Sequence, residues 1–258
     1  MAPEKERCMQ DPALTIIIPC YNSAGFIRQT FADLESFVHK ADDVRVIFVD
    51  DASNDATVAI LTSLVTESEY AARMQLLRNS ENSGKGAAIA RGLSAVNTEF
   101  VCYTDADLAY DTGNLAFFRT HARSGRIVTA NRVHPDSIYL IRPHFFRHIA
   151  SRHLASRVLN RLISFLLVPG IEDAQAGLKL GATTDLRACV SKMTCWRFSF
   201  DTELLTAAHA RGMEIRPLPV QFKYDPGSST VRFARDARDM LLALARIWMR
   251  KIAGKYQD

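Results

Sequence analysis

The chain has 258 residues, of which 48% are hydrophobic, and it carries a formal net charge of +4 at pH 7. This length suffices for one sizeable core, so we expect a single α/β domain over 13–258 after a short N-terminal extension at 1–12. The longest stretch without a charged residue, 12–27, contains Pro19, Asn22 and Ser23 and is too polar to cross a bilayer. The mixed-charge start fits neither a secretory signal nor a transit peptide, which predicts a cytoplasmic location.

Short β-rich runs alternate with amphipathic stretches through the first half of the chain. Strands are predicted at 14–18, 44–49, 74–77 and 100–104, with helices at 24–38, 55–66 and 84–96. Ser53 or Asn54 is the predicted cap of the second helix. The alternation is typical of βαβ units, which predicts a mainly parallel central sheet flanked by helices. Ligands bind at the carboxyl ends of such strands, so the polar residues that follow them are candidates for a site.

The tripeptide Asp105-Ala106-Asp107 directly follows the predicted strand 100–104. Two carboxylates separated by one residue can converge on a divalent cation that also binds the diphosphate of a nucleotide. Hard oxygen ligands suit Mg²⁺ or Mn²⁺, so Asp105 and Asp107 are the candidate metal ligands. The same tripeptide also occurs in ordinary capped turns, and its position after a strand favours the metal site.

Two further polar segments follow predicted strands or open predicted helices. Asp50 and Asp51 can accept hydrogen bonds from a nucleobase or a ribose, or they can cap the helix that follows. Gly84-Lys85-Gly86 looks like a phosphate loop, but the first Gly and the final Ser or Thr of GxxxxGK[ST] are missing, which excludes a P-loop ATPase. No GxGxxG follows the first strand, which argues against a dinucleotide oxidoreductase.

Taken in order, these motifs resemble those of the family-2 glycosyltransferases with a GT-A fold, over about 14–246. Pro19-Cys20-Tyr21-Asn22 resembles the family's P-x-Y-N, 49–57 its VDDGSxDGT, 82–88 its N-x-GKGxA and 104–108 its xDADL, with Ala52 in place of a family Gly. The segments 173–179 and 200–205 resemble the D-x-Q-C-G-F-K and F-D-x-E-L-L of the dolichyl- or polyprenyl-phosphate glucosyltransferase and mannosyltransferase group.

The resemblance implies a single GT-A (Rossmann-like) domain with a nucleotide-sugar half at about 13–132 and an acceptor half at about 133–258. It implies an inverting hexosyltransferase that uses a nucleotide sugar, with UDP-glucose favoured and GDP-mannose possible, and a polyprenyl or dolichyl phosphate acceptor. Arg132 stands where the family has a phosphate-facing arginine. The other residues implied are Pro19, Tyr21 and Asp51 for the nucleoside, Lys85 for the nucleotide, and Asp105, Ala106 and Asp107 for diphosphate and metal.

The acceptor half contains a segment, 137–171, with five arginines and no acidic residue. Within it, 144–168 repeats apolar residues at every fourth position, ending with Val158, Leu162 and Leu166, which predicts a basic amphipathic helix. Such a helix can lie on an anionic membrane surface or pack on the domain with a solvated basic face. A second candidate is 231–249, with Leu241, Leu242, Leu244, Ala245 and Trp248 as its predicted apolar side. Peripheral attachment to the cytoplasmic membrane face is therefore expected.

The acceptor determines which catalytic groups are needed. A phosphomonoester is largely dianionic at neutral pH and needs no strong base, while Arg132, Arg142 and Arg147 would offset repulsion between two phosphate-bearing substrates. A glycan or small-molecule hydroxyl acceptor would need a base, for which Asp173 is the first candidate and Glu203 the second. The remaining alternatives are a basic nucleic-acid-binding module, although no such motif is present, and a non-catalytic relative, which the retained Asp105 and Asp107 disfavour.

Overall fold

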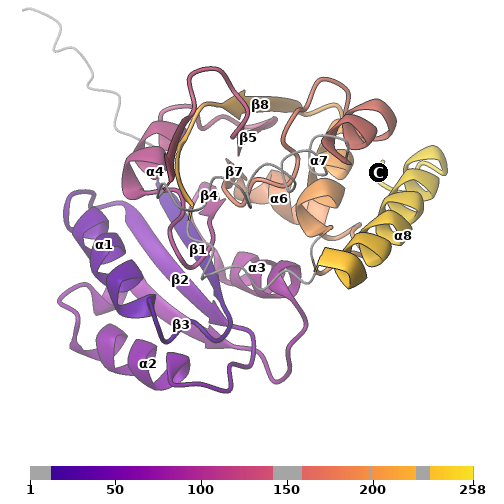
Figure 1. Ribbon diagram of the computed structural model, residues 1–258. Coiled ribbons are helices and arrows are strands. Elements are labelled where there is room, and N and C mark those ends of the chain that lie inside the picture. The colour runs from indigo at the N-terminus through magenta and orange to yellow at the C-terminus, as the bar shows by residue number, and fades with distance from the viewer. Residues whose placement is uncertain (1–12, 142–158, 198, 225–232, 258) are drawn as a thin grey trace, which may run out of the picture.

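A computed structural model describes residues 13–141, 159–197, 199–224 and 233–257 (Figure 1). The expected N-terminal extension, Arg142, Arg147 and most of the predicted helix 144–168 lie outside the described residues. Of that helix, 159–166 is described and is helical.

The first half of the chain forms four parallel strands with helices between them. Each predicted strand and helix of this half is confirmed, with ends shifted by a few residues. The elements are β1 (Leu14–Cys20), α1 (Ile27–His39), β2 (Val44–Asp50), α2 (Thr57–Glu67), η1 (Ala71–Arg73), β3 (Met74–Arg78), α3 (Lys85–Ala95) and β4 (Phe100–Tyr103). The strands β3, β2, β1 and β4 are neighbours in that order, and every pair among them is parallel.

The second half extends the same sheet and adds one antiparallel strand. Its elements are α4 (Thr112–Arg119), β5 (Arg126–Ala130), β6 (Ile138–Ile141), β7 (Lys179–Ala182), α6 (Thr183–Val190), α7 (Phe200–Ala210), β8 (Glu214–Leu218), β9 (Gln221–Tyr224) and α8 (Phe233–Ile252). The seven-stranded sheet has the order β3-β2-β1-β4-β7-β5-β8, and β7 is antiparallel to both of its neighbours. A separate two-stranded sheet pairs β6 with β9 in parallel. The expected α/β fold with a mainly parallel sheet is confirmed.

Helices cover both faces of the sheet. Successive side chains of a strand point to opposite faces, so the helices bury side chains on both sides of each strand. On one face, Ile16 and Phe48 pack in a core cluster with Phe31 of α1. On the other, Ile17 of β1 joins a cluster that includes Leu204 of α7. Because both faces are covered, the central strands are nearly continuous apolar runs, as parallel strands between two helical layers are. Among the described residues, no helix has the length and apolar character of a membrane span.

The loop between β2 and α2 is tied to the loop after β1. The backbone N–H of Asn22 donates to Ser53 Oγ at 2.9 Å, and that of Thr57 donates to Asp55 Oδ1 at 2.9 Å. The prediction that Ser53 or Asn54 caps α2 is wrong, because Ala56 is the N-cap residue and no side chain caps this helix. Ala52, in the same loop, has a φ of 59°, a left-handed conformation that is unfavourable for a residue with a Cβ.

Ala52→Gly should stabilise the protein. The left-handed backbone costs an L-residue about 1–2 kcal/mol, and the greater freedom of glycine in the unfolded chain offsets part of the gain. We expect the free energy of unfolding, measured by urea denaturation, to rise by about 0.5–1 kcal/mol. Ala59→Gly, on the exposed side of α2, is the matched control and should lower it by about as much. Equal destabilisation by both changes would contradict the assignment of strain to Ala52.

Candidate active site

The candidate site lies at the edge of the sheet where β1, β2 and β4 end. Tyr21 follows β1 and is 41% exposed, whereas Asp51 follows β2 and is buried. Asp105 follows β4, and α3 begins beside it with Lys85. Because these strands are parallel, their carboxyl ends meet at one edge, as the sequence predicted.

Lys85 and Asp105 form the central ion pair of this edge. Lys85 Nζ lies 2.7 Å from Asp105 Oδ1 and 3.5 Å from Asp201 Oδ2, and the side chains of Lys85 and Asp105 are both partly exposed. Burial opposes the charge of Lys85, but the two carboxylates outweigh it and raise its pKa. Lys85 is therefore cationic near neutral pH, and it is the lysine that the family resemblance assigned to the nucleotide.

Beneath this pair lies a buried charge network that sequence reasoning did not assign to the site. Lys179 Nζ donates to Asp201 Oδ1 at 2.9 Å, and the hydroxyl of Tyr103 donates to the same oxygen at 2.8 Å. Burial opposes the charge of Asp201, but Lys179 and Lys85 outweigh it and lower its pKa. Burial lowers the pKa of Lys179, and attraction to Asp201 only partly compensates. The sequence contains one signal for this network. An Asp and a Lys each lie within an apolar segment, which usually indicates a buried pair.

The backbone at Gly177 closes over Asp105. A Cβ at this glycine would stand 1.8 Å from Asp105 Oδ2, and the Gly177 N–H donates to the hydroxyl of Tyr110 at 3.3 Å. The segment 173–178 therefore lies directly against the metal-ligand candidate of β4.

The other two residues of the tripeptide are held by local contacts. Asp107 Oδ1 accepts a hydrogen bond from the Ala109 N–H at 3.1 Å, and the carbonyl of Ala106 accepts one from Thr30 Oγ1 of α1 at 2.6 Å. Within the described ranges, no group of three or more His, Cys, Asp or Glu side chains could hold a metal. A cation at Asp105 and Asp107 would thus also need substrate oxygens, which is how Mg²⁺ is commonly bound in phosphate-transferring enzymes.

Asp50 and Asp51 order the loops around the site. Asp50 accepts from the Ser53 N–H at 3.1 Å and lies 3.6 Å from Arg78 Nε. Asp51 accepts from Asn79 Nδ2 at 2.7 Å and from the Gly84 N–H at 2.7 Å, which fixes the loop leading into α3. Both carboxylates therefore accept hydrogen bonds from backbone N–H groups. Contacts of Pro19, Tyr21 and these aspartates with a nucleoside remain predictions.

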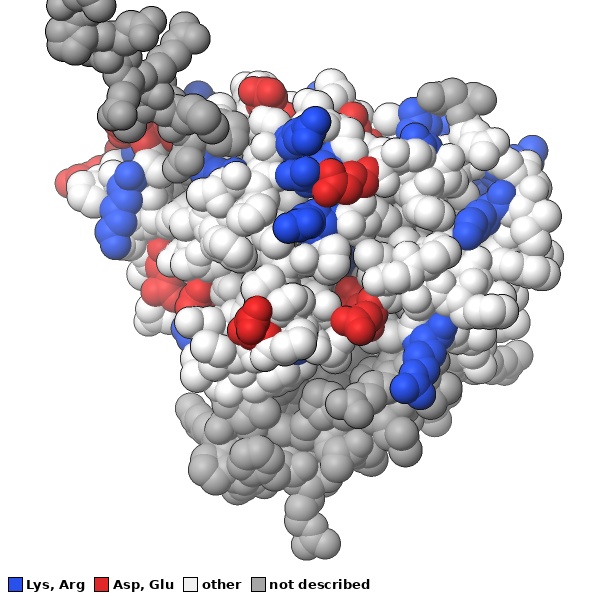
Figure 2. All heavy atoms as spheres, turned by 90° about the horizontal axis from the view of Figure 1, so that it is seen from above, with Lys and Arg blue, Asp and Glu red and all other residues white. Residues whose placement is uncertain are grey.

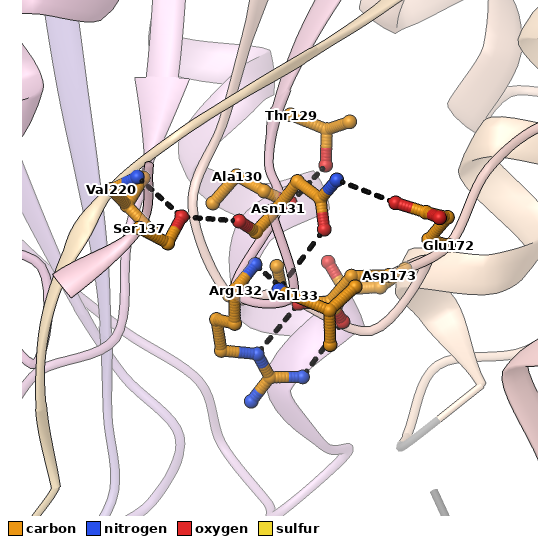
Figure 3. Close-up of polar contacts among 12 residues, drawn as sticks. Thr129, Ala130, Asn131, Arg132, Val133, Ser137, Glu172, Asp173 and Val220 are labelled. Carbon is orange, nitrogen blue, oxygen red and sulfur yellow. Dashed lines mark hydrogen bonds and ion pairs between the residues drawn. The ribbon is translucent and has the colours of Figure 1, made fainter. Parts of the chain in front are cut away.

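Arg132 and Asp173 form a two-pronged ion pair between the loops after β5 and before β7 (Figure 3). Arg132 Nε and Nη2 donate to the two carboxylate oxygens at 2.7 and 2.8 Å, and the Arg132 N–H donates at 3.0 Å. Asp173 is 2% exposed and Arg132 29%. Burial opposes the charge of Asp173, but Arg132 outweighs it and lowers its pKa. Asp173 is thus placed to orient the arginine and is a weak base.

Glu203, the second candidate base, is fully buried in α7. It accepts hydrogen bonds from the backbone N–H groups of Thr194 and Cys195, at 2.9 and 2.6 Å, and from the Tyr256 hydroxyl at 2.7 Å. These contacts tie α7 to the end of the chain and assign Glu203 a structural role.

A mainly parallel sheet with aspartates and a lysine at its carboxyl edge defines the class of nucleotide-sugar enzymes with a GT-A fold. The sequence profile "Glycosyl transferase family 2" matches residues 15–179, and the chain belongs to this family. It is a glycosyltransferase.

Relatives cover most of the chain. Glycosyltransferase AglD of Haloferax volcanii is 28% identical over 91% of this chain, which corresponds to 37% of AglD. The dolichyl-phosphate β-glucosyltransferase of Dictyostelium discoideum is 26% identical over 91% of this chain and 76% of the relative.

Solved structures confirm the fold. Mannosyltransferase PcManGT from Pyrobaculum calidifontis, in complex with GDP-Man and Mn²⁺, superposes with a TM-score of 0.55 at 18% identity, covering 97% of this chain and 66% of that one. Glucosyl-3-phosphoglycerate synthase from Mycobacterium tuberculosis, in complex with Mn²⁺, UDP and phosphoglyceric acid, gives a TM-score of 0.57 at 15% identity, with 95% and 79% covered.

Gly177→Ala should disturb the site through packing alone. The new methyl group would overlap Asp105 Oδ2, so either the loop or the carboxylate must move. We expect a loss of about 1–3 kcal/mol in the free energy of unfolding. Gly181→Ala in β7 is the matched control, because its nearest neighbours would lie at 3.4 Å, an ordinary contact. Equal stability of the two variants in denaturant would contradict the close approach at Gly177.

Asp173→Asn should remove a pH-dependent contribution to stability. Because the pKa of Asp173 is lowered in the folded state, its stabilisation is present above the ordinary Asp pKa of about 3.9 and is lost as the pH falls through the lower value. Near neutral pH we expect the variant to be less stable by about 2–4 kcal/mol, with the difference shrinking below about pH 4. Asp136→Asn, at a carboxylate that is 80% exposed, should show no such difference. Urea unfolding across this pH range tests it, and a pH-independent difference would contradict the assignment.

Proposed function

We propose that this glycosyltransferase transfers a hexose, with inversion, from a nucleotide sugar to a polyprenyl or dolichyl phosphate. The observation that carries the proposal is the joining of two charged pairs by one short segment. Asp173 of that segment pairs with Arg132, and Gly177 of the same segment packs on Asp105, which pairs with Lys85. Groups suited to a diphosphate and an arginine suited to a second phosphate are thereby held next to each other.

On the donor side, Asp105 and Asp107 would hold Mg²⁺ or Mn²⁺ together with the diphosphate. Such a cation, when bound, offsets the negative charge that grows on the leaving diphosphate. The fit is supported by the chemistry of the two carboxylates and by the Mn²⁺ in the two solved relatives. Lys85 adds a fixed positive charge at the same edge, and exposed Tyr21 offers a ring on which a nucleobase can stack.

A glucosyl donor, which we propose to be UDP-glucose, is supported by the names of the relatives. Several of them are named dolichyl-phosphate β-glucosyltransferases, including those of Dictyostelium discoideum and Drosophila melanogaster. GDP-mannose is the alternative donor, because PcManGT binds GDP-Man on the same fold.

On the acceptor side, the lipid phosphate would attack the anomeric carbon directly. One of its oxygens forms the new bond to this carbon as the bond from the carbon to the diphosphate oxygen breaks, so no proton needs to be removed. The partly exposed guanidinium of Arg132, oriented by Asp173, would bind the incoming phosphate and reduce its repulsion from the donor.

A hydroxyl acceptor is the weaker alternative. It requires a general base, and the candidate carboxylate, Asp173, is paired with Arg132 and has a lowered pKa. Membership of a glycosyltransferase family disfavours the nucleic-acid-binding alternative. A lipid acceptor implies peripheral attachment on the cytoplasmic membrane face, which we include in the proposal.

Transfer should depend on Asp107. With radiolabelled UDP-glucose or GDP-mannose and a polyprenyl phosphate in detergent, we expect labelled lipid from one donor and a loss of about 100-fold or more in Asp107→Ala. Asp42→Ala, at an exposed acid before β2, is the matched control and should retain activity. Transfer that survives both Asp107→Ala and chelation of divalent metal would refute the proposed mechanism.

A further inference from the structure

The outward face of α8 is an exposed apolar surface. Six side chains form it: Leu241 (56% exposed), Leu242 (56%), Ala245, Trp248 (41%), Met249 (59%) and Ile252 (67%). We call these residues the α8 surface. A helix that is apolar on its solvent side as well as its core side normally has a further partner, and a contiguous patch of this kind marks an interaction site.

The opposite face of α8 is packed into the protein, which fixes the direction of the α8 surface. Leu244 and Ile247 are buried in the core cluster that includes α7. Lys251 Nζ donates to the carbonyl of Leu167 at 2.7 Å, and Arg250 Nη2 donates to that of Lys192. Of the five residues of the predicted apolar side, only Leu244 is in the core, while the other four are exposed.

The helical segment 159–166 lies beside α8 and adds to the exposed apolar area. The Lys251 side chain also reaches the carbonyl of Leu166, which places the end of this segment next to the last turn of α8. Phe165 is 84% exposed and Leu162 37%, whereas Ile163 is buried. Of the predicted stripe, Leu162 is exposed, whereas Leu166 is partly buried against the core cluster.

Two exposed arginines, Arg161 and Arg246, lie in the same two helical segments as this apolar area. In the described ranges 159–171 and 240–252 there are four basic residues and no acidic one, and Arg161 and Arg246 are both exposed. Figure 2 shows the corresponding margin of the molecule, on the right, with Lys and Arg set among uncharged residues and without Asp or Glu. An exposed apolar area with exposed arginines beside it complements a surface that is apolar inside and anionic outside.

We propose that the α8 surface, with Phe165, docks on an anionic lipid bilayer. Its apolar side chains would enter the boundary of the acyl chains, and Arg161 and Arg246 would face the lipid phosphates. Trp248 suits such a boundary because its ring is apolar and its N–H can still be hydrated. A second copy of the chain fits less well, because it would bring the exposed arginines of the two copies together.

Docking at α8 would also place the proposed site close to the lipid. Gln175 Nε2 lies 3.0 Å from Met240 Sδ of α8, and Gln175 belongs to the same loop as Asp173. A bilayer held against α8 would therefore lie near the loop that orients Arg132. This consequence for the acceptor rests on the proposed function, whereas binding of the bilayer itself does not.

Binding to vesicles without any acceptor lipid tests the proposal. The full chain is mixed with vesicles of equal parts phosphatidylcholine and phosphatidylglycerol, and bound protein is measured by co-sedimentation. For the combined variant Leu241→Gln, Trp248→Gln and Ile252→Gln we expect partition to fall about 100-fold, because three apolar side chains no longer enter the bilayer. Because these side chains are exposed in the free protein, the circular dichroism spectrum and the unfolding midpoint should not change.

Two control variants remove an apolar or a basic side chain elsewhere on the surface, so that docking through α8 can be distinguished from a loss of apolar area or charge anywhere on the protein. Phe117→Gln removes an apolar side chain of α4 with the same 41% exposure as Trp248 and should leave vesicle binding unchanged. Arg246→Gln should weaken binding about fivefold, whereas Arg123→Gln, at an exposed arginine before β5, should not.

Two results would overturn the proposal. One is vesicle binding that the triple variant does not weaken. The other is absent vesicle binding together with a concentration-dependent dimer, seen by sedimentation, that the triple variant abolishes. Transfer in detergent is measured separately, so failure of the proposed reaction would not be mistaken for failure of docking.

Discussion

The site depends on one buried carboxylate, that of Asp201, held between Lys179 and Lys85. Without Asp201 the fully buried Lys179 would lose its ion pair, and breaking a buried pair costs about 3–5 kcal/mol. Asp201 also keeps Lys85 at the junction with Asp105. Lys179 comes from β7 and Asp201 from α7, so the second half of the chain builds the floor of the proposed donor site. The antiparallel strand β7 is what brings these two halves together beside β4.

The acidic residues of the site differ in their partners and therefore in their roles. Asp51 and Glu203 are saturated by backbone N–H groups, and Asp173 is saturated by Arg132, so these carboxylates hold structure and do not abstract protons. Asp105 differs, because it pairs with Lys85, a partly exposed side chain that could rearrange to admit the proposed cation and diphosphate. In this site the acids are paired, and the cations that pair with them, Lys85 and Arg132, are partly exposed. Such a site suits a substrate that is already anionic, so a phosphate acceptor fits it better than a hydroxyl.

The sequence predicted what depends on local patterns and strand order. Alternating β-rich and amphipathic segments located the strands, and the rule that parallel strands end at one edge placed Asp51 and Asp105 together. The ion pairs could not be read from it, because Lys179 and Asp201 meet only after β7 inserts between β4 and β5. Helical periodicity likewise predicted one apolar side for this helix, but tertiary packing decided that Leu244 is buried and Leu241 exposed.

The two-sided character of α8 connects the fold with the proposed lipid substrate. Its inner side is fixed by Ile247 in the core and by Lys251 on the carbonyls of the neighbouring helical segment, so the outer side has one orientation relative to the sheet. Gln175 then joins α8 to the loop that carries Asp173. A polyprenyl phosphate has a head group that must reach Arg132 and a tail that gains most by staying in the bilayer. A protein that rests on the bilayer through α8 would satisfy both requirements without extracting the lipid.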